Sequence, residues 1–140
     1  MAIERTLFII KPDGVERHLI GKILAAVEER GFRIAEARLA RLTREECQTF
    51  YAEHQGKPFF HDLVAYMTSG PVLLAVLERE NAVATLSELV GATDPAQAAP
   101  GTLRKQFGQS KQLNSVHRSD SLASAEREVK LFFGVAALTH

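Results

Sequence analysis

The chain has 140 residues, of which 46% are hydrophobic and 24% are charged, and its 17 basic and 17 acidic residues give a formal net charge of zero. This composition predicts a folded globular protein, and the length fits a single domain with one core. The balanced charge argues against bulk basicity that binds nucleic acid or an anionic membrane. One cysteine excludes an internal disulfide framework and a multi-cysteine zinc site.

The distribution of apolar residues predicts a soluble, cytoplasmic protein. No apolar run approaches the roughly 18 residues expected of a membrane-spanning helix. The first residues, Met1–Thr6, carry charges and lack the pattern of a signal peptide. We therefore expect no membrane-spanning segment.

The first third of the chain predicts a strand, a helix and a second strand. Residues 6–10 are apolar and β-rich, as in a central strand that is covered on both faces, and Lys11–Gly14 stops that strand in a turn. Lys11 is thus placed at the carboxyl end of a strand. Residues 20–30 are amphipathic at helical period, and residues 32–42 alternate as in a strand with one wetter face.

The rest of the chain adds helices, two more strands and a long loop. The loop runs from Ala92 to Gly101, and loops of this length inside a compact domain are usually functional or assembly elements. The other expected elements are a helix from Thr43 to Tyr51, a helix over 59–67, a strand over 72–77, a helix over 80–90, a helical turn over 102–107 and a last strand over 129–133. This order predicts an α+β fold with a ferredoxin-like, four-stranded antiparallel sheet covered by helices, as a single domain over residues 1–140.

The stretch Asn114–Glu128 contains the candidate for chemistry. His117 lies among small polar residues, just ahead of a helix that one of residues 119–121 would cap. We expect His117 in a loop running into that helix N-terminus, where free N–H groups favour a bound anion. Glu128 comes at the far end of the same helix, and a carboxylate that reaches an imidazole fixes its tautomer and raises its basicity. This combination suggests nucleophilic attack on phosphorus.

Several motifs together resemble one family, the nucleoside diphosphate kinases. The resemblance runs in order from Ile3 to about Phe133, and the short C-terminus resembles the bacterial-type members. The motifs are Lys11–Val15, Tyr51–Phe60, Ser69–Pro71, Gly91–Pro95, Gly101–Arg104 and His117–Ser121.

The resemblance implies a ping-pong transfer of the γ-phosphoryl group from a nucleoside triphosphate to a diphosphate through a phosphohistidine. His117 matches the nucleophile, Ser119 and Glu128 match the residues that orient its imidazole, and Tyr51 matches the hydroxyl beside it. The matched nucleotide contacts are Lys11, Thr93 and Arg104 for the phosphates with His54 nearby, Asn114 and Lys11 for the ribose, and Phe59 for the base. Mg²⁺ would arrive with the nucleotide rather than occupy a metal site of the protein.

The resemblance also implies a homo-oligomer, a tetramer or hexamer built from dimers, in which the loop from Ala92 to Gly101 contacts neighbouring subunits. Two positions depart from the family pattern. Ser87 stands where the family usually has an arginine that contacts the phosphates, and Arg118 stands where it usually has a small residue after the nucleophile. The guanidinium of Arg118 could replace the missing one, or it could point to solvent or pair with an acidic residue.

Two alternatives to an active kinase follow from the sequence. The departures at Ser87 and Arg118 would fit a catalytically weakened nucleotide-binding relative with a regulatory or assembly role. A ferredoxin-like sheet would also fit a nucleic-acid-binding module. The zero net charge argues against that module, as does the lack of solvent-facing aromatic pairs on the predicted strands.

Overall fold

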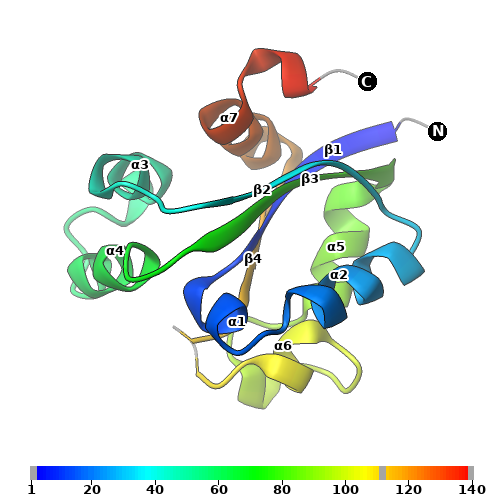
Figure 1. The fold of residues 1–140 in the computed structure, drawn as a ribbon, viewed down its shortest axis with the longest axis horizontal. Helices are drawn as coiled ribbons and strands as arrows, with labels where there is room; N and C mark the ends of the chain where they lie inside the picture. Colours follow the sequence, from blue (N-terminus) through cyan, green and yellow to red (C-terminus); the bar gives the residue numbers. More distant parts are fainter. Residues whose placement is uncertain (1–2, 111–112, 139–140) are drawn as a thin grey trace.

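The computed structural model describes residues 3–110 and 113–138. Its strands are β1 (Ile3–Ile10), β2 (Arg33–Ala40), β3 (Val72–Glu80) and β4 (Val116–Arg118). They form a four-stranded antiparallel sheet in the order β2-β3-β1-β4, with β1 and β3 at its centre (Figure 1). The predicted α+β fold with a ferredoxin-like antiparallel sheet is confirmed.

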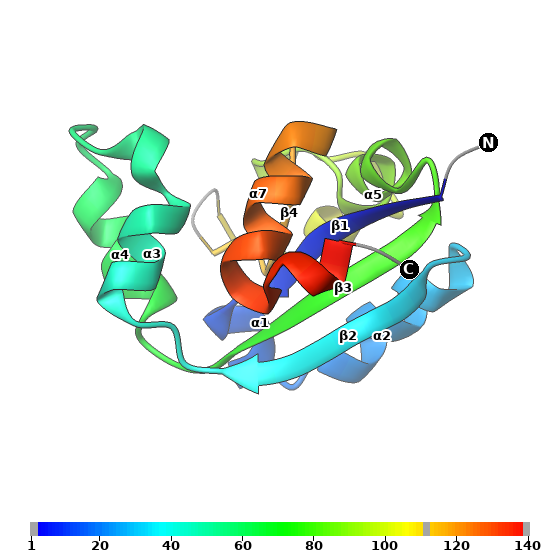
Figure 2. The same cartoon turned by 90° about the horizontal axis from the view of Figure 1, so that it is seen from above.

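Helices cover both faces of the sheet. The α-helices are α1 (Pro12–Glu16), α2 (Ile20–Glu29), α3 (Arg44–Phe50), α4 (Phe60–Met67), α5 (Ala82–Val90), α6 (Leu103–Phe107) and α7 (Leu122–Phe133), and short 3₁₀ helices span Ala52–His54, Pro95–Gln97 and Val135–Leu138. The helices α2, α5 and α6 pack on one face, and α3, α4 and α7 pack on the other. Figure 2 shows α3 and α4 side by side at one end of the molecule.

Strand β1 connects the two halves of the core. Leu7 and Ile9 belong to the apolar cluster under α3, α4 and α7, whereas Phe8 and Ile10 belong to the cluster under α2, α5 and α6. All four side chains are fully buried. Complete burial of one such side chain stabilises a fold by roughly 1.5–3 kcal/mol. The central strand predicted for residues 6–10 is confirmed, and its rigid carboxyl end holds Lys11.

The prediction of a last strand over residues 129–133 is wrong. These residues form the end of α7, and the fourth strand is the three-residue β4 that precedes this helix. Ala125, Val129 and Phe132 are buried at helical spacing, while Lys130 is exposed, so this segment has the period of a helix. Strand β4 pairs with β1, and His117 lies opposite Ile9.

A capping box formed by Thr43 and Glu46 fixes the start of α3. The Thr43 hydroxyl accepts a hydrogen bond from the Glu46 backbone N–H at 3.0 Å, and the Glu46 carboxylate accepts one from the Thr43 N–H at 2.9 Å. This capping box satisfies two backbone donors that the first turn leaves free. Helix α3 ends at Phe50 with Tyr51 as its C-cap, so a well-defined helix places both aromatic side chains.

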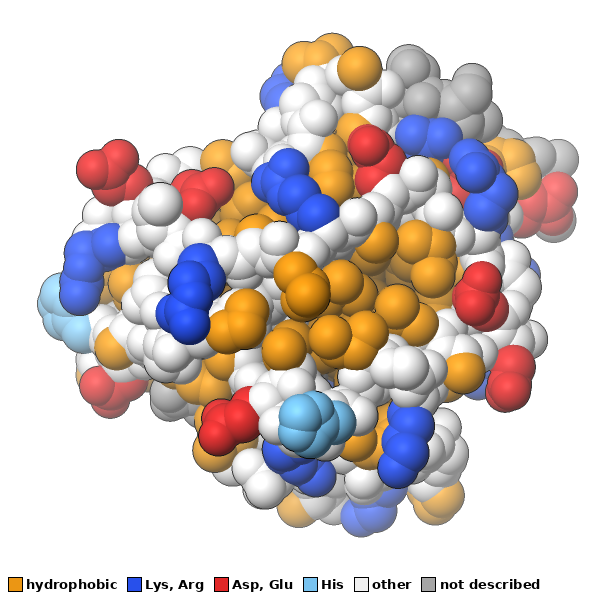
Figure 3. Space-filling model, viewed as in Figure 1, with side chains coloured by type: hydrophobic (Ala, Val, Ile, Leu, Met, Phe, Trp, Pro, Cys, Tyr) orange, Lys and Arg blue, Asp and Glu red, His pale blue; other side chains and the backbone are white. Residues whose placement is uncertain are grey.

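The surface carries charges of both signs. On the face drawn in Figure 3, acidic and basic side chains are interspersed around a group of hydrophobic side chains, with no continuous basic area. This distribution agrees with the balanced composition and does not favour a nucleic-acid interface on that face. Within residues 3–110 and 113–138, no helix is both long and apolar enough to cross a membrane.

Candidate functional site

A pocket of about 540 Å³ brings together the residues that the sequence singles out. We call it the His117 pocket. Its lining includes almost all of the predicted site residues, namely Lys11, Tyr51, His54, Phe59, Thr93, Arg104, Asn114, His117 and Glu128. Ser119 is the exception, because it is buried behind the wall, where its hydroxyl donates a 2.7 Å hydrogen bond to Glu128 Oε1.

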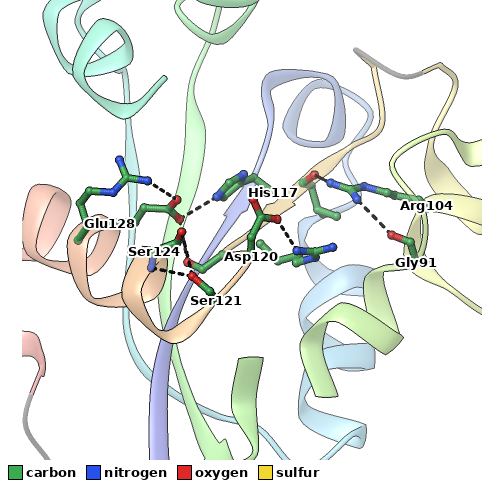
Figure 4. A network of polar contacts seen from close by, with 11 residues as sticks. Gly91, Arg104, His117, Asp120, Ser121, Ser124 and Glu128 are labelled. Carbon is green, nitrogen blue, oxygen red and sulfur yellow. Dashed lines mark hydrogen bonds and ion pairs between the residues drawn. The ribbon is translucent and has the colours of Figure 1, made fainter. Parts of the chain in front are cut away.

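The imidazole of His117 is oriented from α7. Its Nε2 lies 2.9 Å from Glu128 Oε1, and a dashed line marks this contact in Figure 4. A carboxylate only accepts hydrogen bonds, so Nε2 carries the hydrogen and Nδ1 keeps its lone pair. The ring also packs edge-on against Phe50, with 4.7 Å between ring centroids. These contacts fix both the tautomer and the plane of the ring.

The electrostatics of this pair favour a neutral imidazole beside an ionised carboxylate. Burial lowers the pKa of His117, and the nearby Glu128 opposes this only in part. Burial alone would raise the pKa of Glu128, but the hydrogen bonds that its carboxylate accepts from His117 and Ser119 hold it below its usual value. At neutral pH the imidazole therefore has a free electron pair on Nδ1.

A buried hydrogen-bond chain holds Lys11 in the pocket. Lys11 Nζ donates to Asn114 Oδ1 at 2.8 Å, and Asn114 Nδ2 donates to the Thr93 carbonyl at 3.1 Å. The Lys11 backbone N–H donates to the carbonyl of Ser115, a residue held in the left-handed region at φ 74°. Burial, and next the charge of Arg104, lowers the pKa of Lys11 to about 7. A bound anion would therefore stabilise the charged form of this lysine.

Arg104 is fixed by backbone carbonyls. Its Nη1 donates to the Gly91 carbonyl at 3.1 Å and its Nη2 donates to the Val116 carbonyl at 3.0 Å, as drawn in Figure 4. Burial, and next the charge of Arg118, lowers its pKa to about 10, so it stays charged at neutral pH. Its Nε is buried without a hydrogen-bond partner. The two carbonyls therefore hold this cation in a fixed position in the pocket.

Aromatic side chains line the part of the pocket near α4. His54 packs between Tyr51 and Phe59, with centroid distances of 6.0 and 5.3 Å. Phe59 is 46% exposed, so its ring is open to a planar ligand. The Tyr51 hydroxyl and His54 Nδ1 are buried polar atoms without a hydrogen-bond partner. Burial is the main cause that raises the pKa of Tyr51, so its hydroxyl remains a donor.

Comparison with known proteins gives one family. The family model described as nucleoside diphosphate kinase matches residues 4–138. The chain belongs to the nucleoside diphosphate kinase family. A relative of that name from Pasteurella multocida (strain Pm70) is 57% identical over 133 residues, which cover 95% of this chain and 96% of the relative.

Solved structures of the same family share the fold. The nucleoside diphosphate kinase of Aquifex aeolicus superposes with a TM-score of 0.94 at 42% identity and covers 99% of this chain and 100% of its own. The halophilic nucleoside diphosphate kinase of Halobacterium salinarum, solved in complex with CDP, gives a TM-score of 0.94 at 41% identity. That match covers 99% of this chain and 93% of the other.

Two expectations about the surroundings of His117 need correction in this nucleoside diphosphate kinase family member. His117 lies in strand β4 and not in a loop, because β4 completes the sheet beside β1. The N-terminus of α7 does not form the predicted anion site, since the pocket lining includes no residue of its first turn. Ser121 Oγ instead accepts the Ser124 N–H at 3.1 Å, and the positive charge in the pocket comes from side chains.

The pocket lining also includes residues that the sequence did not identify as site residues. Phe50 looks like any apolar helix residue, yet its ring supports His117. The sequence left open whether Arg118 replaces the missing guanidinium, points to solvent or pairs with an acidic residue; its side chain lines the pocket and pairs with Asp120. The remaining additional members of the lining are Glu53, Leu63 and Asp120. The other departure, Ser87, is half-buried in α5 and is not part of the lining.

Proposed function

We propose that the protein is a nucleoside diphosphate kinase that transfers the γ-phosphoryl group of a nucleoside triphosphate to a nucleoside diphosphate through a phosphohistidine at His117. The observation that carries this proposal is the 2.9 Å contact between His117 Nε2 and Glu128, which leaves Nδ1 as the free nucleophilic nitrogen. The cations Lys11 and Arg104 line the same pocket. Relatives that are named nucleoside diphosphate kinases support the proposal, and one of them is solved in complex with CDP.

In the first half-reaction, the lone pair of His117 Nδ1 attacks the γ-phosphorus in line with the bridging oxygen. The bond from that oxygen to phosphorus breaks, and the nucleoside diphosphate leaves with the electron pair. The imidazole becomes a cationic phosphohistidine, and Glu128 stabilises that charge through Nε2–H. The second half-reaction reverses these steps with a different diphosphate as the acceptor.

The protein's own contribution is orientation and charge. Phosphoryl transfer requires an in-line nucleophile and positive charge around the equatorial oxygens, and Lys11 and Arg104 supply that charge here. The buried Tyr51 hydroxyl, which lacks a partner, would donate to the phosphoryl group as it passes to His117. His54 Nδ1, also buried and without a partner, is a second polar atom beside the phosphates.

The nucleoside would bind with its base on Phe59 and its ribose on Asn114 and Lys11. Stacking on one aromatic ring accepts any base, because every base has a π-face. Thr93 lies beside Asn114 through the 3.1 Å hydrogen bond of its carbonyl, so it is positioned for a phosphate contact. None of these contacts reads base identity, and we expect broad nucleotide specificity.

Mg²⁺ would enter the pocket with the nucleotide. Within residues 3–110 and 113–138 there is no group of three or more His, Cys, Asp or Glu side chains that could hold a metal ion. Besides Glu128, the pocket has Glu53 and Asp120 as carboxylates. This donor set fits an ion bound mainly by phosphate oxygens and water, with Glu53 and Asp120 holding its water ligands. The ion would neutralise negative charge on the β- and γ-phosphates.

The proposal extends to assembly and location. We propose that residues 1–140 form one catalytic domain that assembles into dimers, and these into a tetramer or hexamer, with the loop from Ala92 to Gly101 at subunit contacts. Pro95 and Ala98 in this loop are buried. Light scattering that shows only monomer at micromolar concentration would contradict the assembly. The cytoplasm, where nucleoside triphosphates are made and used, is the proposed compartment.

A product-release experiment tests the reaction scheme. Purified protein mixed with excess Mg·ATP and no acceptor should release about one ADP per chain. ADP release should then stop, because the phosphorylated enzyme can pass its phosphoryl group only to a diphosphate. Adding GDP should then produce GTP without further ATP. ADP release that occurs only when GDP is already present would contradict the two-step scheme and favour direct transfer between bound nucleotides.

A further inference from the structure

The geometry points to Arg118 as a third phosphate-binding cation of the His117 pocket, whose guanidinium exchanges Asp120 for the phosphates of a bound nucleotide. This inference rests on the proposed function, because it needs a nucleotide in the pocket. It adds a binding residue to that function at a position where the resemblance to the family predicts a small side chain.

The side chain of Arg118 reaches the pocket from the side of α5 and α6. Side chains alternate along a strand, so Arg118 shares a face of β4 with Val116, which packs in the apolar cluster under α5 and α6. Arg104 extends from α6 on that same side, and its Nη2 donates to the Val116 carbonyl. Arg118 and Arg104 both line the pocket, while His117 faces α7.

Two guanidinium groups with unused donors therefore lie in one pocket. The Nε atoms of both Arg104 and Arg118 are buried and lack a hydrogen-bond partner. The charge of Arg118 is the second cause, after burial, that lowers the pKa of Arg104 to about 10, which indicates that the two groups are close. Like charges repel, so an anion beside them stabilises this arrangement, as Asp120 does in part. A chain of phosphates carries more negative charge and would stabilise it further.

The ion pair between Arg118 and Asp120 is largely open to solvent on the Asp120 side. Arg118 Nη1 lies 2.5 Å from Asp120 Oδ1, but the Asp120 side chain is 76% exposed whereas that of Arg118 is 19% exposed. An ion pair with a solvated carboxylate contributes little to stability, because water screens it. A nucleotide phosphate carries more negative charge and binds a guanidinium through charge-assisted, bidentate hydrogen bonds. Phosphates should therefore displace Asp120.

The alternative is that Arg118 serves only to fix the turn between β4 and α7 through Asp120. In that case its removal would affect folding stability and the whole pocket alike, including the part that binds the nucleoside. A phosphate contact predicts a selective effect instead, because the nucleoside itself has no phosphate. The two alternatives thus differ in how binding of ADP changes relative to binding of adenosine.

The experiment measures dissociation constants of ADP and adenosine by calorimetry for the full chain and for the Arg118→Gln, Arg118→Lys and Arg41→Gln variants. Arg41 is exposed and lies outside the pocket lining, so Arg41→Gln removes the same charge as a matched control. A charge-assisted contact corresponds to about ten- to a hundred-fold in affinity. We expect Arg118→Gln to weaken ADP binding by that factor and Arg118→Lys by less. We also expect adenosine binding to stay unchanged, as it should for both ligands in Arg41→Gln.

Two outcomes would overturn the inference. If the dissociation constant of ADP for Arg118→Gln is within about twofold of that for the unmodified chain, Arg118 does not contact the phosphates. Equal loss of ADP and adenosine binding assigns Arg118 a structural role only. A failure of the proposed function is recognised separately, because it would appear as the absence of ADP release from Mg·ATP in the unmodified chain, whatever the affinity of Arg118→Gln for ADP.

Discussion

His117 Nε2 lies 2.9 Å from Glu128 Oε1, although the two residues come from different elements, the edge strand β4 and the second half of helix α7. The same oxygen accepts the Ser119 hydroxyl at 2.7 Å. The carboxylate is therefore fixed from two sides before it fixes the imidazole. Through this contact the packing of α7 on the sheet determines which nitrogen of His117 is free to react.

Glu128→Gln tests the role of this contact. The neutral amide cannot stabilise the positive charge that develops on the imidazole, and its NH₂ group can also hold the wrong tautomer. We expect the rate of His117 phosphorylation to fall by about ten- to a hundred-fold, the range of a charge-assisted hydrogen bond. Glu126→Gln changes an exposed carboxylate of the same helix and should leave the rate unchanged. Equal rates for Glu128→Gln and Glu126→Gln, in rapid-quench measurements with ATP, would contradict the role of Glu128.

Tyr51→Phe tests the donor whose hydroxyl is buried without a partner. If the hydroxyl contacts the phosphoryl group only during transfer, its removal slows transfer but leaves ground-state binding intact. We expect kcat to fall by about two- to tenfold, which is the range of a neutral hydrogen bond, with the dissociation constant of ADP unchanged. Loss of ADP affinity without loss of kcat would place Tyr51 in substrate binding instead. The edge-on packing of this ring on Phe50, at 4.6 Å between centroids, is retained in the variant.

The pKa of Lys11, lowered to about 7, predicts that ADP binding takes up protons. In the free protein at pH 8 most Lys11 is neutral, and a bound phosphate favours the ammonium form, so binding raises the pKa. Affinity should therefore fall as the pH rises above 7, by at most about tenfold per pH unit. Calorimetry in buffers of different ionisation enthalpy should show proton uptake at pH 8 that is lost in Lys11→Gln. Zero uptake at pH 8 in the unmodified chain would contradict the lowered pKa of Lys11 in the free protein.

The two departures from the family pattern can be tested as a pair. Ser87 is in α5, which covers the face of β4 that Arg118 shares with Val116. If Arg118 replaces the guanidinium that the family usually has at position 87, Arg118→Gly should reduce kcat/KM strongly with Ser87 present. The reduction should be much smaller in the Ser87→Arg background. Equal reductions in both backgrounds would mean that the two positions act independently.

The fold was largely predictable because long elements carry strong periodic signals. Residues 7–10 and 72–77 are apolar throughout, and Thr43 and Glu46 form a capping box at the start of α3. The fourth strand was not predictable in the same way, because its three residues are too few to show alternation. Residues 129–133 are β-rich in composition, but burial of Val129 and Phe132 on one side of α7 determines their helical structure.

The sequence predicted which residues form the site, but not how their side chains are arranged. Residues as distant in sequence as Lys11, Phe59 and Glu128 meet in one pocket, and only the motifs of the resemblance linked them beforehand. The direction of the Arg118 side chain depends on the register of β4 against β1, which sequence does not reveal. The free nitrogen of His117 likewise depends on which ring edge α7 approaches.

The most direct test of the account is the chemical state of His117 after incubation with Mg·ATP. We predict one phosphate per chain, carried on His117 and lost in acid, because a phosphoramidate is hydrolysed in acid whereas a phosphoserine survives. Mass spectrometry of the intact chain before and after acid treatment, together with phosphopeptide mapping at neutral pH, makes this measurement. The His117→Ala variant should carry no phosphate. A phosphate that persists on His117→Ala, or one that is stable to acid in the unmodified chain, would contradict the assignment of His117 as the nucleophile.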